Sequence, residues 1–206
     1  MNIESQIIDL KKEIPHLKYQ ISLDIHPVLE RDLGLKSGLG WIGKNSMLIN
    51  KSHGSFFIIA TILTDQLFNW ENHSVETDHC GQCTRCVDQC PTSAIDPKTR
   101  TIIAKDCIST FTIEEFKLET VPSDKMNLKS GFIFGCDICQ DVCPWNRFSK
   151  PNTEPTFAPL PEVLNLSTAD WEHLTQDSFK KIFGKSALKR AGYKGIQRNI
   201  RFITNA

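Results

Sequence analysis

The sequence contains no apolar run near the roughly 18 residues that a membrane-spanning helix requires. It also shows no secretory signal peptide. Lysine and arginine number 24, and aspartate and glutamate number 24, so the formal net charge is zero. A neutral chain lacks the overall basic charge that marks many nucleic-acid-binding proteins. We therefore expect a cytoplasmic protein with no membrane partner.

Patterns of several common enzyme classes are absent as well. No pair of acidic residues suggests hydrolysis, and no Ser–His–Asp set can be assembled from the sequence. The segment Gly38-Leu-Gly-Trp-Ile-Gly-Lys-Asn45 has three glycines in six residues but does not fit the P-loop pattern. Glycine allows the backbone to approach a ligand closely, yet such a loop alone is more often a turn than a binding site.

Cysteine is abundant, with eight residues in the chain. The first run is Cys80-Gly-Gln-Cys83-Thr-Arg-Cys86-Val-Asp-Gln-Cys90-Pro91. Its spacing is that of a bacterial-type [4Fe–4S] ligand run, in which the fourth cysteine binds the other cluster of a two-cluster protein. A second run is Cys136-Asp-Ile-Cys139-Gln-Asp-Val-Cys143-Pro144, and Cys107 lies between the two. Two such clusters need eight thiolates, so no cysteine is left over.

The crossed spacing predicts how the cysteines divide between the clusters. The first cluster would be held by Cys80, Cys83, Cys86 and Cys143. The second would be held by Cys90, Cys107, Cys136 and Cys139. Zinc normally uses two separated cysteine pairs, and disulfides require an oxidising compartment. Two [4Fe–4S] clusters are therefore favoured over both alternatives.

Hydrophobic patterning predicts an α+β fold in three parts. Residues 1–75 begin with an amphipathic helix that ends before Pro15, followed by a short strand at 21–23 and a helix over 28–36. A hairpin of 47–49 and 56–63 follows, with its turn at 50–54. Residues 76–147 form a ferredoxin-like module, with a helix over 111–118. Residues 148–206 comprise a proline-rich linker and a helical segment that begins with a capping box at 167–170.

The C-terminal segment is locally basic in an otherwise neutral chain. No acidic residue follows Asp177 in the sequence. Six basic residues follow Gly184: Lys185, Lys189, Arg190, Lys194, Arg198 and Arg201. A solvated helix face and a phosphate-contacting surface explain this equally well.

Several motifs, taken together and in this order, resemble those of epoxyqueuosine reductase. They are Asp24-Ile-His-Pro-Val-Leu-Glu-Arg31, the Gly38–Asn45 segment, the first cysteine run, Cys107-Ile-Ser109 with Thr112-Ile-Glu114, and Ile133-Phe-Gly-Cys-Asp-Ile-Cys139 with Cys143-Pro-Trp-Asn146. The resemblance runs from about Asp24 to Arg201. It implies an oxidoreductase that uses cobalamin and two [4Fe–4S] clusters to remove the epoxide oxygen of epoxyqueuosine in a tRNA anticodon loop, which completes queuosine.

The resemblance also implies roles for single residues. Asp24 matches the proposed proton donor, although without the resemblance a helix N-cap or turn role would be preferred for it. Ser109, Cys136 and Asp137 match positions against the cobalamin. Lys44 and Asn45 lie in the loop near cofactor and substrate. The tRNA contacts implied in the C-terminal helices are Lys189, Arg190 and Arg198.

The chain departs from the family pattern before Asp24, where members usually carry a longer segment. The resemblance therefore implies only a partial cobalamin-binding α/β domain in residues 1–75, completed by a separate chain if the sequence is not a fragment. An electron donor such as flavodoxin or ferredoxin would serve the clusters. Two alternatives remain open: a two-cluster electron-transfer protein without its own catalysis, and a related cobalamin enzyme such as a reductive dehalogenase. The basic tail and the missing export signal disfavour the dehalogenase.

Overall fold

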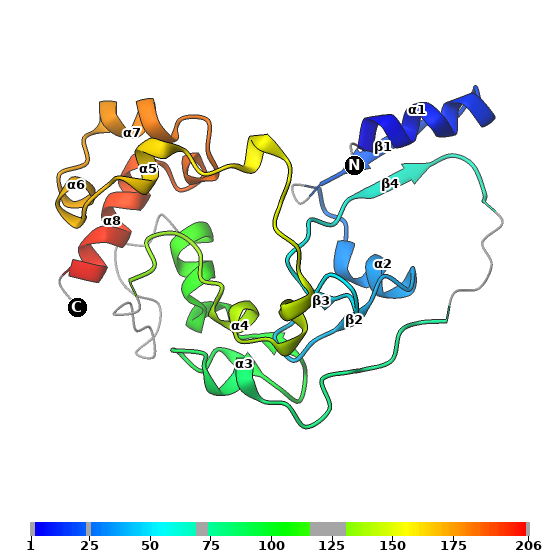
Figure 1. The fold of residues 1–206 in the computed structure, drawn as a ribbon, viewed down its shortest axis with the longest axis horizontal. Coiled ribbons are helices and arrows are strands. Elements are labelled where there is room, and N and C mark those ends of the chain that lie inside the picture. Colours follow the sequence, from blue (N-terminus) through cyan, green and yellow to red (C-terminus); the bar gives the residue numbers. More distant parts are fainter. Residues whose placement is uncertain (1–2, 24–25, 69–73, 116–130, 205–206) are drawn as a thin grey trace.

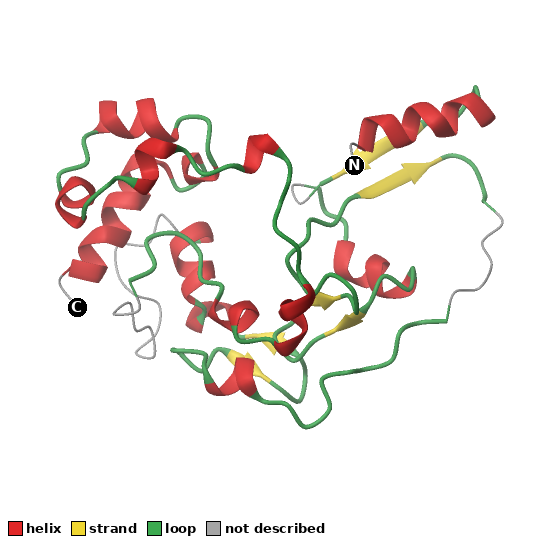
Figure 2. Cartoon of the chain, in the orientation of Figure 1, coloured by secondary structure: helices red, strands yellow, loops and turns green. Residues whose placement is uncertain are grey.

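A computed structural model describes the chain except for residues 1–2, 24–25, 69–73, 116–130 and 205–206. The N-terminal helix and strands lie on one side of the molecule and the C-terminal helices on the other (Figure 1). The short helices of the two cysteine runs lie between them, at the lower centre of the view. Helices and strands are both short and are linked by long stretches of loop (Figure 2).

The N-terminal part combines two helices with two small sheets. Its elements are α1 (Ile3–Glu13), β1 (Tyr19–Ser22), α2 (Glu30–Lys36), β2 (Trp41–Ile42), β3 (Leu48–Ile49) and β4 (Thr61–Thr64). The predicted amphipathic helix, first strand and second helix are confirmed, although α2 begins two residues later than expected. Ile7 is the residue of α1 that is buried, which agrees with a single apolar face.

The predicted hairpin of 47–49 and 56–63 is wrong. Strand β3 pairs instead with β2, and β4 pairs with β1, with Tyr19 opposite Thr64. The turn itself forms, because Asn50 and Gly54 exchange backbone hydrogen bonds of 2.8 and 2.9 Å. After this turn the chain leaves β3, which pairs with β2 inside the Gly38–Asn45 segment, and continues to β4, which pairs with β1.

The cysteine-containing part is built from very short elements. These are α3 (Arg85–Asp88), β5 (Ile95–Asp96), β6 (Thr101–Ile102), the 3₁₀-helix η1 (Ala104–Asp106), the π-helix η2 (Thr110–Glu114), α4 (Ile138–Asp141) and the 3₁₀-helix η4 (Pro144–Phe148). Strands β5 and β6 form a third antiparallel pair. Of the helix expected over 111–118, the structure has a π-helix that ends at Glu114, and residues 116–118 lie outside the described range.

The C-terminal part is helical. It contains η5 (Pro155–Phe157), α5 (Pro161–Leu164), α6 (Thr168–Glu172), α7 (Gln176–Phe183), η6 (Ala187–Lys189) and α8 (Gly192–Thr204). The capping box is confirmed, since Ser167 and Asp170 each bond the other's backbone N–H at the start of α6. Six buried residues form the largest core cluster, between α7 and α8: Leu174, Phe179, Phe183, Ala191, Ile196 and Ile200.

The fold is thus a mixture of helices and strands, as the α+β expectation requires. All three described strand pairings are antiparallel, so the parallel arrangement typical of an α/β domain is not seen among the described residues of the N-terminal part. In the same described ranges, no helix has the length and apolar character needed to cross a bilayer.

Candidate metal centre

Four cysteines predicted to hold the first cluster line a single cavity. The cavity has a volume of about 200 Å³, and Cys80, Cys83, Cys86 and Cys143 all contribute to its wall. Cys80 and Cys83 precede α3, Cys86 lies within it, and Cys143 directly precedes η4. The two cysteine runs, which are distant in sequence, therefore meet here, because α3 and α4 pack against each other. The crossed ligand set matches what one cubane would need at this position.

The other four cysteines also lie near one another. The negative charges of Cys107 and Cys90 act on Cys136, and those of Cys136, Cys107 and Cys90 act on Cys139. The charge of Cys86, which belongs to the first set, also acts on Cys139. The backbone N–H of Ala94 donates a 3.3 Å hydrogen bond to Cys90 Sγ, a contact that stabilises thiolate or cluster-bound sulfur.

The donor chemistry fits two iron–sulfur clusters better than the alternatives. All eight cysteines are free and half-buried, so no disulfide competes for them. Among the described residues, no group of three or more His, Cys, Asp or Glu side chains converges as the ligands of one ion would. Cubane ligands are spaced more widely, because each cysteine binds a different iron atom. The arrangement therefore disfavours a single zinc ion.

Burial makes these thiols weak acids in the absence of iron. Burial, followed by the charges of Cys80 and Cys143, raises the pKa of Cys86 from 9.0 to about 11. Burial, followed by the charges of Cys136 and Cys107, raises the pKa of Cys139 to about 12. The pKa values of Cys136 and Cys143 are also raised, chiefly by burial. Clustered thiolates without a cation repel one another, so iron must displace protons as it binds.

The Gly38–Asn45 segment contacts both cysteine runs directly. Lys44 Nζ donates hydrogen bonds of 2.8 and 2.9 Å to the carbonyl oxygens of Gly81 and Cys83. Asn45 Nδ2 donates a 3.1 Å bond to the carbonyl oxygen of Cys139. Both side chains also line the first cysteine cavity. The sequence did not predict these contacts, which connect the glycine-rich loop to the cysteine loops; a cobalamin contact of Lys44 and Asn45 stays a prediction.

One glycine of this loop has a packing role. A Cβ atom at Gly40 would lie 1.9 Å from the carbonyl oxygen of Ile49, which is shorter than any real contact. Strands β2 and β3 can therefore pair only with glycine at this position. At Gly40, the absence of a side chain therefore allows two backbone segments to approach each other closely.

Arg100 forms a second link between the loop and the cysteine part. Its guanidinium binds both carboxylate oxygens of Asp78 and donates a 2.6 Å bond to the carbonyl oxygen of Ile42. The bond to Arg100 is the largest reason that the pKa of Asp78 falls from 3.8 to about 2. Sequence reasoning missed Arg100, because an isolated arginine in a turn gives no sign of a partner 22 residues earlier.

Of the residues predicted to lie against the cobalamin, Cys136 packs against Ile108 and Phe111, which flank the region of Ser109. Ser109 directly precedes the π-helix, Cys136 belongs to the second cysteine set, and Asp137 is exposed at the start of α4. A π-helical turn is rare and often marks a functional site. Asp24, the predicted proton donor, lies outside the described residues.

The prediction that Arg198 contacts tRNA is contradicted by its burial. Its side chain is 3% exposed, and its guanidinium lies 4.3 Å from the centre of the Phe111 ring. It donates a 2.7 Å bond to the carbonyl oxygen of Phe111 and a further bond to that of Glu115. Arg198 therefore fastens α8 to the π-helix. The periodicity of α8 alone does not reveal which cations face inward.

Lys189 and Arg190 are both exposed, as a tRNA contact requires. Arg190 forms a 2.6 Å ion pair with Glu114, and both partners are about half exposed. Breaking such an exposed ion pair costs little free energy, so Arg190 remains available to contact a tRNA phosphate. The proposed tRNA-contacting set is therefore reduced to these two residues.

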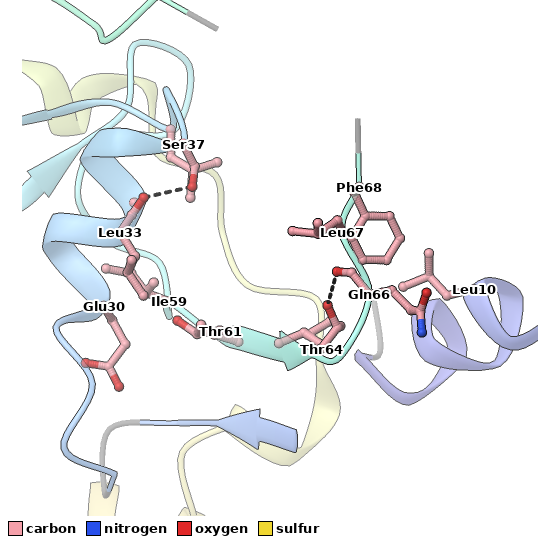
Figure 3. Close-up of a pocket in the computed structure, with 14 residues that line it drawn as sticks. Leu10, Glu30, Leu33, Ser37, Ile59, Thr61, Thr64, Gln66, Leu67 and Phe68 are labelled. Carbon is pink, nitrogen blue, oxygen red and sulfur yellow. Dashed lines mark hydrogen bonds between the residues drawn. The ribbon is translucent and has the colours of Figure 1, made fainter. Parts of the chain in front are cut away.

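An apolar groove lies apart from the cysteines, in the N-terminal part. It has a volume of about 540 Å³ and is lined by residues of α1, α2 and the β4 region, including Leu10, Leu33, Ile59 and Leu67. Figure 3 shows these side chains facing one another across the space between α2 and the end of β4. None of the residues predicted to bind cobalamin lines this groove.

A family model matches the cysteine-containing part of the chain. Residues 79–146 match the model of the 4Fe-4S double cluster binding domain. This range contains all eight cysteines and both predicted ligand sets. This part of the chain is thus similar to iron–sulfur domains of the two-cluster type.

Curated relatives then narrow the resemblance to epoxyqueuosine reductases. The epoxyqueuosine reductase of Cyclobacterium marinum is 48% identical over 196 residues, covering 95% of this chain and 61% of that protein. That of Cellulophaga algicola is 48% identical over 194 residues, covering 94% and 62%. The chain therefore spans about three-fifths of the length of these relatives.

Solved structures agree with the sequence comparison. A selenomethionine-labelled epoxyqueuosine reductase superposes with a TM-score of 0.82 at 27% identity, over 98% of this chain and 52% of that chain. An epoxyqueuosine reductase bound to an epoxyqueuosine-modified tRNA-Tyr stem loop gives a TM-score of 0.79 at 26% identity, over 98% and 53%. The resemblance read from the sequence motifs is thereby confirmed, in sequence and in fold, for the part of those proteins that the chain covers.

Proposed function

We propose that this chain takes part in the reduction of epoxyqueuosine to queuosine in tRNA, with cobalamin and two [4Fe–4S] clusters as cofactors. The supporting observation is the crossed arrangement of eight cysteines inside a chain that resembles epoxyqueuosine reductases over almost its whole length. The division into residues 1–75, 76–147 and 148–206 belongs to the same proposal: a partial cobalamin and substrate domain, a two-cluster domain and a basic helical segment.

The cysteine sets would hold two clusters in series. Cys80, Cys83, Cys86 and Cys143 would bind the first, and Cys90, Cys107, Cys136 and Cys139 the second. Cys139 of the second set lies within electrostatic reach of Cys86 of the first, so electrons would have a short path between the clusters. The second set is adjacent in sequence to Ser109 and Asp137, the positions that the resemblance assigns to the cobalamin.

Bound cobalamin would supply the reducing centre that the amino acids lack, with single electrons delivered through the clusters. This chain's own residues would position the substrate and manage the proton. Asp24 would donate a proton to the departing epoxide oxygen, since an alkoxide leaves more readily as an alcohol.

Partners follow from the same resemblance. A tRNA anticodon loop would meet the exposed cations Lys189 and Arg190, since phosphate contacts favour accessible basic side chains. An electron donor of the flavodoxin or ferredoxin type would reduce the clusters. If this chain functions without further residues of its own, we propose that a separate chain supplies the remainder of the cobalamin domain.

The test is anaerobic reconstitution followed by titration with cob(II)alamin, monitored by electron paramagnetic resonance. The proposal expects a base-off spectrum and cobalamin that is retained on desalting. Turnover of epoxyqueuosine tRNA should then be abolished by Asp24→Ala while cluster content and cobalamin binding are unchanged. An unaltered free-cobalamin spectrum, with no turnover, would contradict the proposed reaction for this chain.

The second candidate is a two-cluster electron-transfer protein. The match of residues 79–146 to a double cluster binding domain favours it, because that domain alone suffices for electron transfer. The two candidates separate cleanly in the same titration. An electron carrier would be reduced and reoxidised normally but would neither bind cobalamin nor depend on Asp24.

A further inference from the structure

The cavity of the first cysteine set has an uneven distribution of charge. Besides the four cysteines, its lining includes Lys44, His79 and Arg147, and no carboxylate lines it. Arg147 is also held by neutral groups, since its guanidinium lies 4.3 Å from the centre of the Phe148 ring and donates a bond to the carbonyl oxygen of Pro144. Lys44 differs from Arg147 in that its charged group is hydrogen-bonded to the loop that contains Cys80 and Cys83.

The ammonium group of Lys44 is held in place by neutral groups only. Its two hydrogen bonds go to the carbonyl oxygens of Gly81 and Cys83, within the loop that supplies the first cysteines. Within the described ranges, Lys44 forms no ion pair with a carboxylate. Its positive charge is therefore not cancelled by a neighbouring anion, and it is half-buried, where screening by water is weaker than at an exposed site.

The second cysteine set has a carboxylate directly beside one of its ligands. The charges that act on Cys136 come from Cys107, Cys90 and Asp137, whereas those that act on Cys139 come from other cysteines alone. Asp137 follows Cys136 directly and is exposed, with one carboxylate oxygen bonded to Gln140. Lys44 thus places a positive charge beside the first set, and Asp137 places a negative charge beside the second. Asp78, which accepts a 2.8 Å bond from the backbone N–H of Cys80, is paired with Arg100 and so adds little net charge to the first set.

We infer that Lys44 raises the reduction potential of the first cluster and Asp137 lowers that of the second, so that the first cluster is the more easily reduced. Reduction adds one electron, and hence one negative charge, to a cluster. A fixed cation stabilises the added charge and a fixed anion destabilises it, and nearby charge is one of the established determinants of cluster potential. This inference rests on the proposed binding of two [4Fe–4S] clusters.

The experiment is a redox titration of the anaerobically reconstituted full chain without cobalamin, followed by electron paramagnetic resonance. Lys44→Gln removes the charge but keeps an amide donor, whereas Lys44→Arg keeps the charge. We expect Lys44→Gln to reduce the reduced-to-oxidised ratio of the first cluster at a given potential roughly tenfold, which is about 59 mV for a one-electron couple. Lys44→Arg should stay near the wild-type value, and the second cluster should be unaffected by either.

Asp137→Asn supplies the matched test of opposite sign. It should make the second cluster easier to reduce, by a smaller amount because Asp137 is exposed, and leave the first unchanged. Lys36→Gln, at an exposed position near the end of α2, controls for the loss of a distant lysine. The variant Cys107→Ala, which should retain only the first cluster, assigns each reduction step to its cluster.

Three results would overturn the inference. One is a wild-type chain in which the second cluster is reduced first. Another is a Lys44→Gln variant whose first-cluster potential is unchanged, or whose two potentials move together. A Lys44→Arg variant that behaves like Lys44→Gln would show that the bond geometry, and not the charge, is responsible. A wild-type chain that binds fewer than two clusters would instead refute the proposed function, and the inference with it.

Discussion

Asn45 Nδ2 donates a hydrogen bond of 3.1 Å to the carbonyl oxygen of Cys139, although the two residues are 94 positions apart in the sequence. Asn45 is 1% exposed, and its side-chain oxygen accepts a 3.3 Å bond from the backbone N–H of Met47. The side chain thus joins the turn between β2 and β3 to α4, the helix that carries Cys139. The glycine-rich loop and the cysteine part consequently act as one structural unit.

Asn45→Ala should measurably weaken this connection between the glycine-rich loop and α4. It leaves the Cys139 carbonyl oxygen without its donor in a half-buried position, so we expect the free energy of unfolding to fall by about 1–3 kcal/mol. Denaturant unfolding of the reconstituted chain measures it. Asn152→Ala, at an exposed asparagine that bonds only within its own turn, should change stability by less than about 0.5 kcal/mol. Equal effects of the two substitutions would contradict the role of Asn45.

Cys107→Ala should remove the second cluster and leave the first. Cys107 is the single ligand that comes from neither cysteine run, and its charge acts on Cys136 and Cys139. We expect the iron content to fall from about eight to about four per chain, with one electron paramagnetic resonance signal retained. Iron analysis after anaerobic reconstitution measures this. A variant that kept both clusters would refute the ligand assignment.

Arg198→Met should destabilise the protein without altering any direct phosphate contact. The substitution leaves the carbonyl oxygens of Phe111 and Glu115 without their donor, so we expect a loss of roughly 1–3 kcal/mol in the free energy of unfolding. Lys189→Met is the matched control on the surface. It should change stability by less than about 0.5 kcal/mol but lower the salt dependence of tRNA stem-loop binding by about one unit of slope.

The opposite pattern would restore Arg198 as a tRNA contact. In that case Arg198→Met would leave the unfolding midpoint unchanged and would lower the salt slope. Binding is best compared at several salt concentrations, because a folding defect lowers affinity equally at all of them whereas a lost phosphate contact does not.

The pair of Arg100 and Asp78 makes a pH-dependent contribution whose sign is fixed by the pKa of Asp78. Arg100 lowers that pKa from 3.8 to about 2, so the pair stabilises the folded state at pH values above about 4 and loses its effect as the pH falls towards 2. The pair is partly exposed, so Arg100→Gln should cost only about 1 kcal/mol or less.

Between pH 5 and 8 the cost of Arg100→Gln should be constant, because Asp78 stays ionised in both the folded and the unfolded states throughout that range. Unfolding of wild type and variant at several pH values within this window tests it. A cost that changed steadily across the window would mean that another titrating group, rather than Asp78, is the main partner of Arg100.

Local sequence signals predicted the elements that local chemistry determines. The spacing of the cysteines predicted two sets, the apolar period predicted α1, and the serine and aspartate at 167 and 170 predicted the start of α6. Errors occurred where a distant partner decides. The pairing of β4 depends on β1, with Tyr19 opposite Thr64, and the inward orientation of Arg198 depends on the carbonyl groups of the π-helix.

Gly54→Ala should disrupt a second set of contacts between the N-terminal part and the cysteine-containing part. Gly54 has φ of +70°, and a Cβ atom there would lie 2.1 Å from Asn146 Oδ1. That oxygen accepts a 2.6 Å bond from the backbone N–H of Ser55, and Asn146 Nδ2 donates to the carbonyl oxygen of Gln140 in α4. An added methyl group must therefore displace Asn146 from both partners.

Gly192→Ala separates this clash from the backbone cost of a positive φ. Gly192 has φ of +69°, nearly that of Gly54, but a Cβ atom there would meet nothing within 4 Å. Gly192→Ala should therefore show only the conformational cost of about 1 kcal/mol. Gly54→Ala should add roughly 1–3 kcal/mol for the lost hydrogen bonds of Asn146. If unfolding measurements gave the same cost for both substitutions, Asn146 would not couple the turn at 50–54 to the second cysteine run.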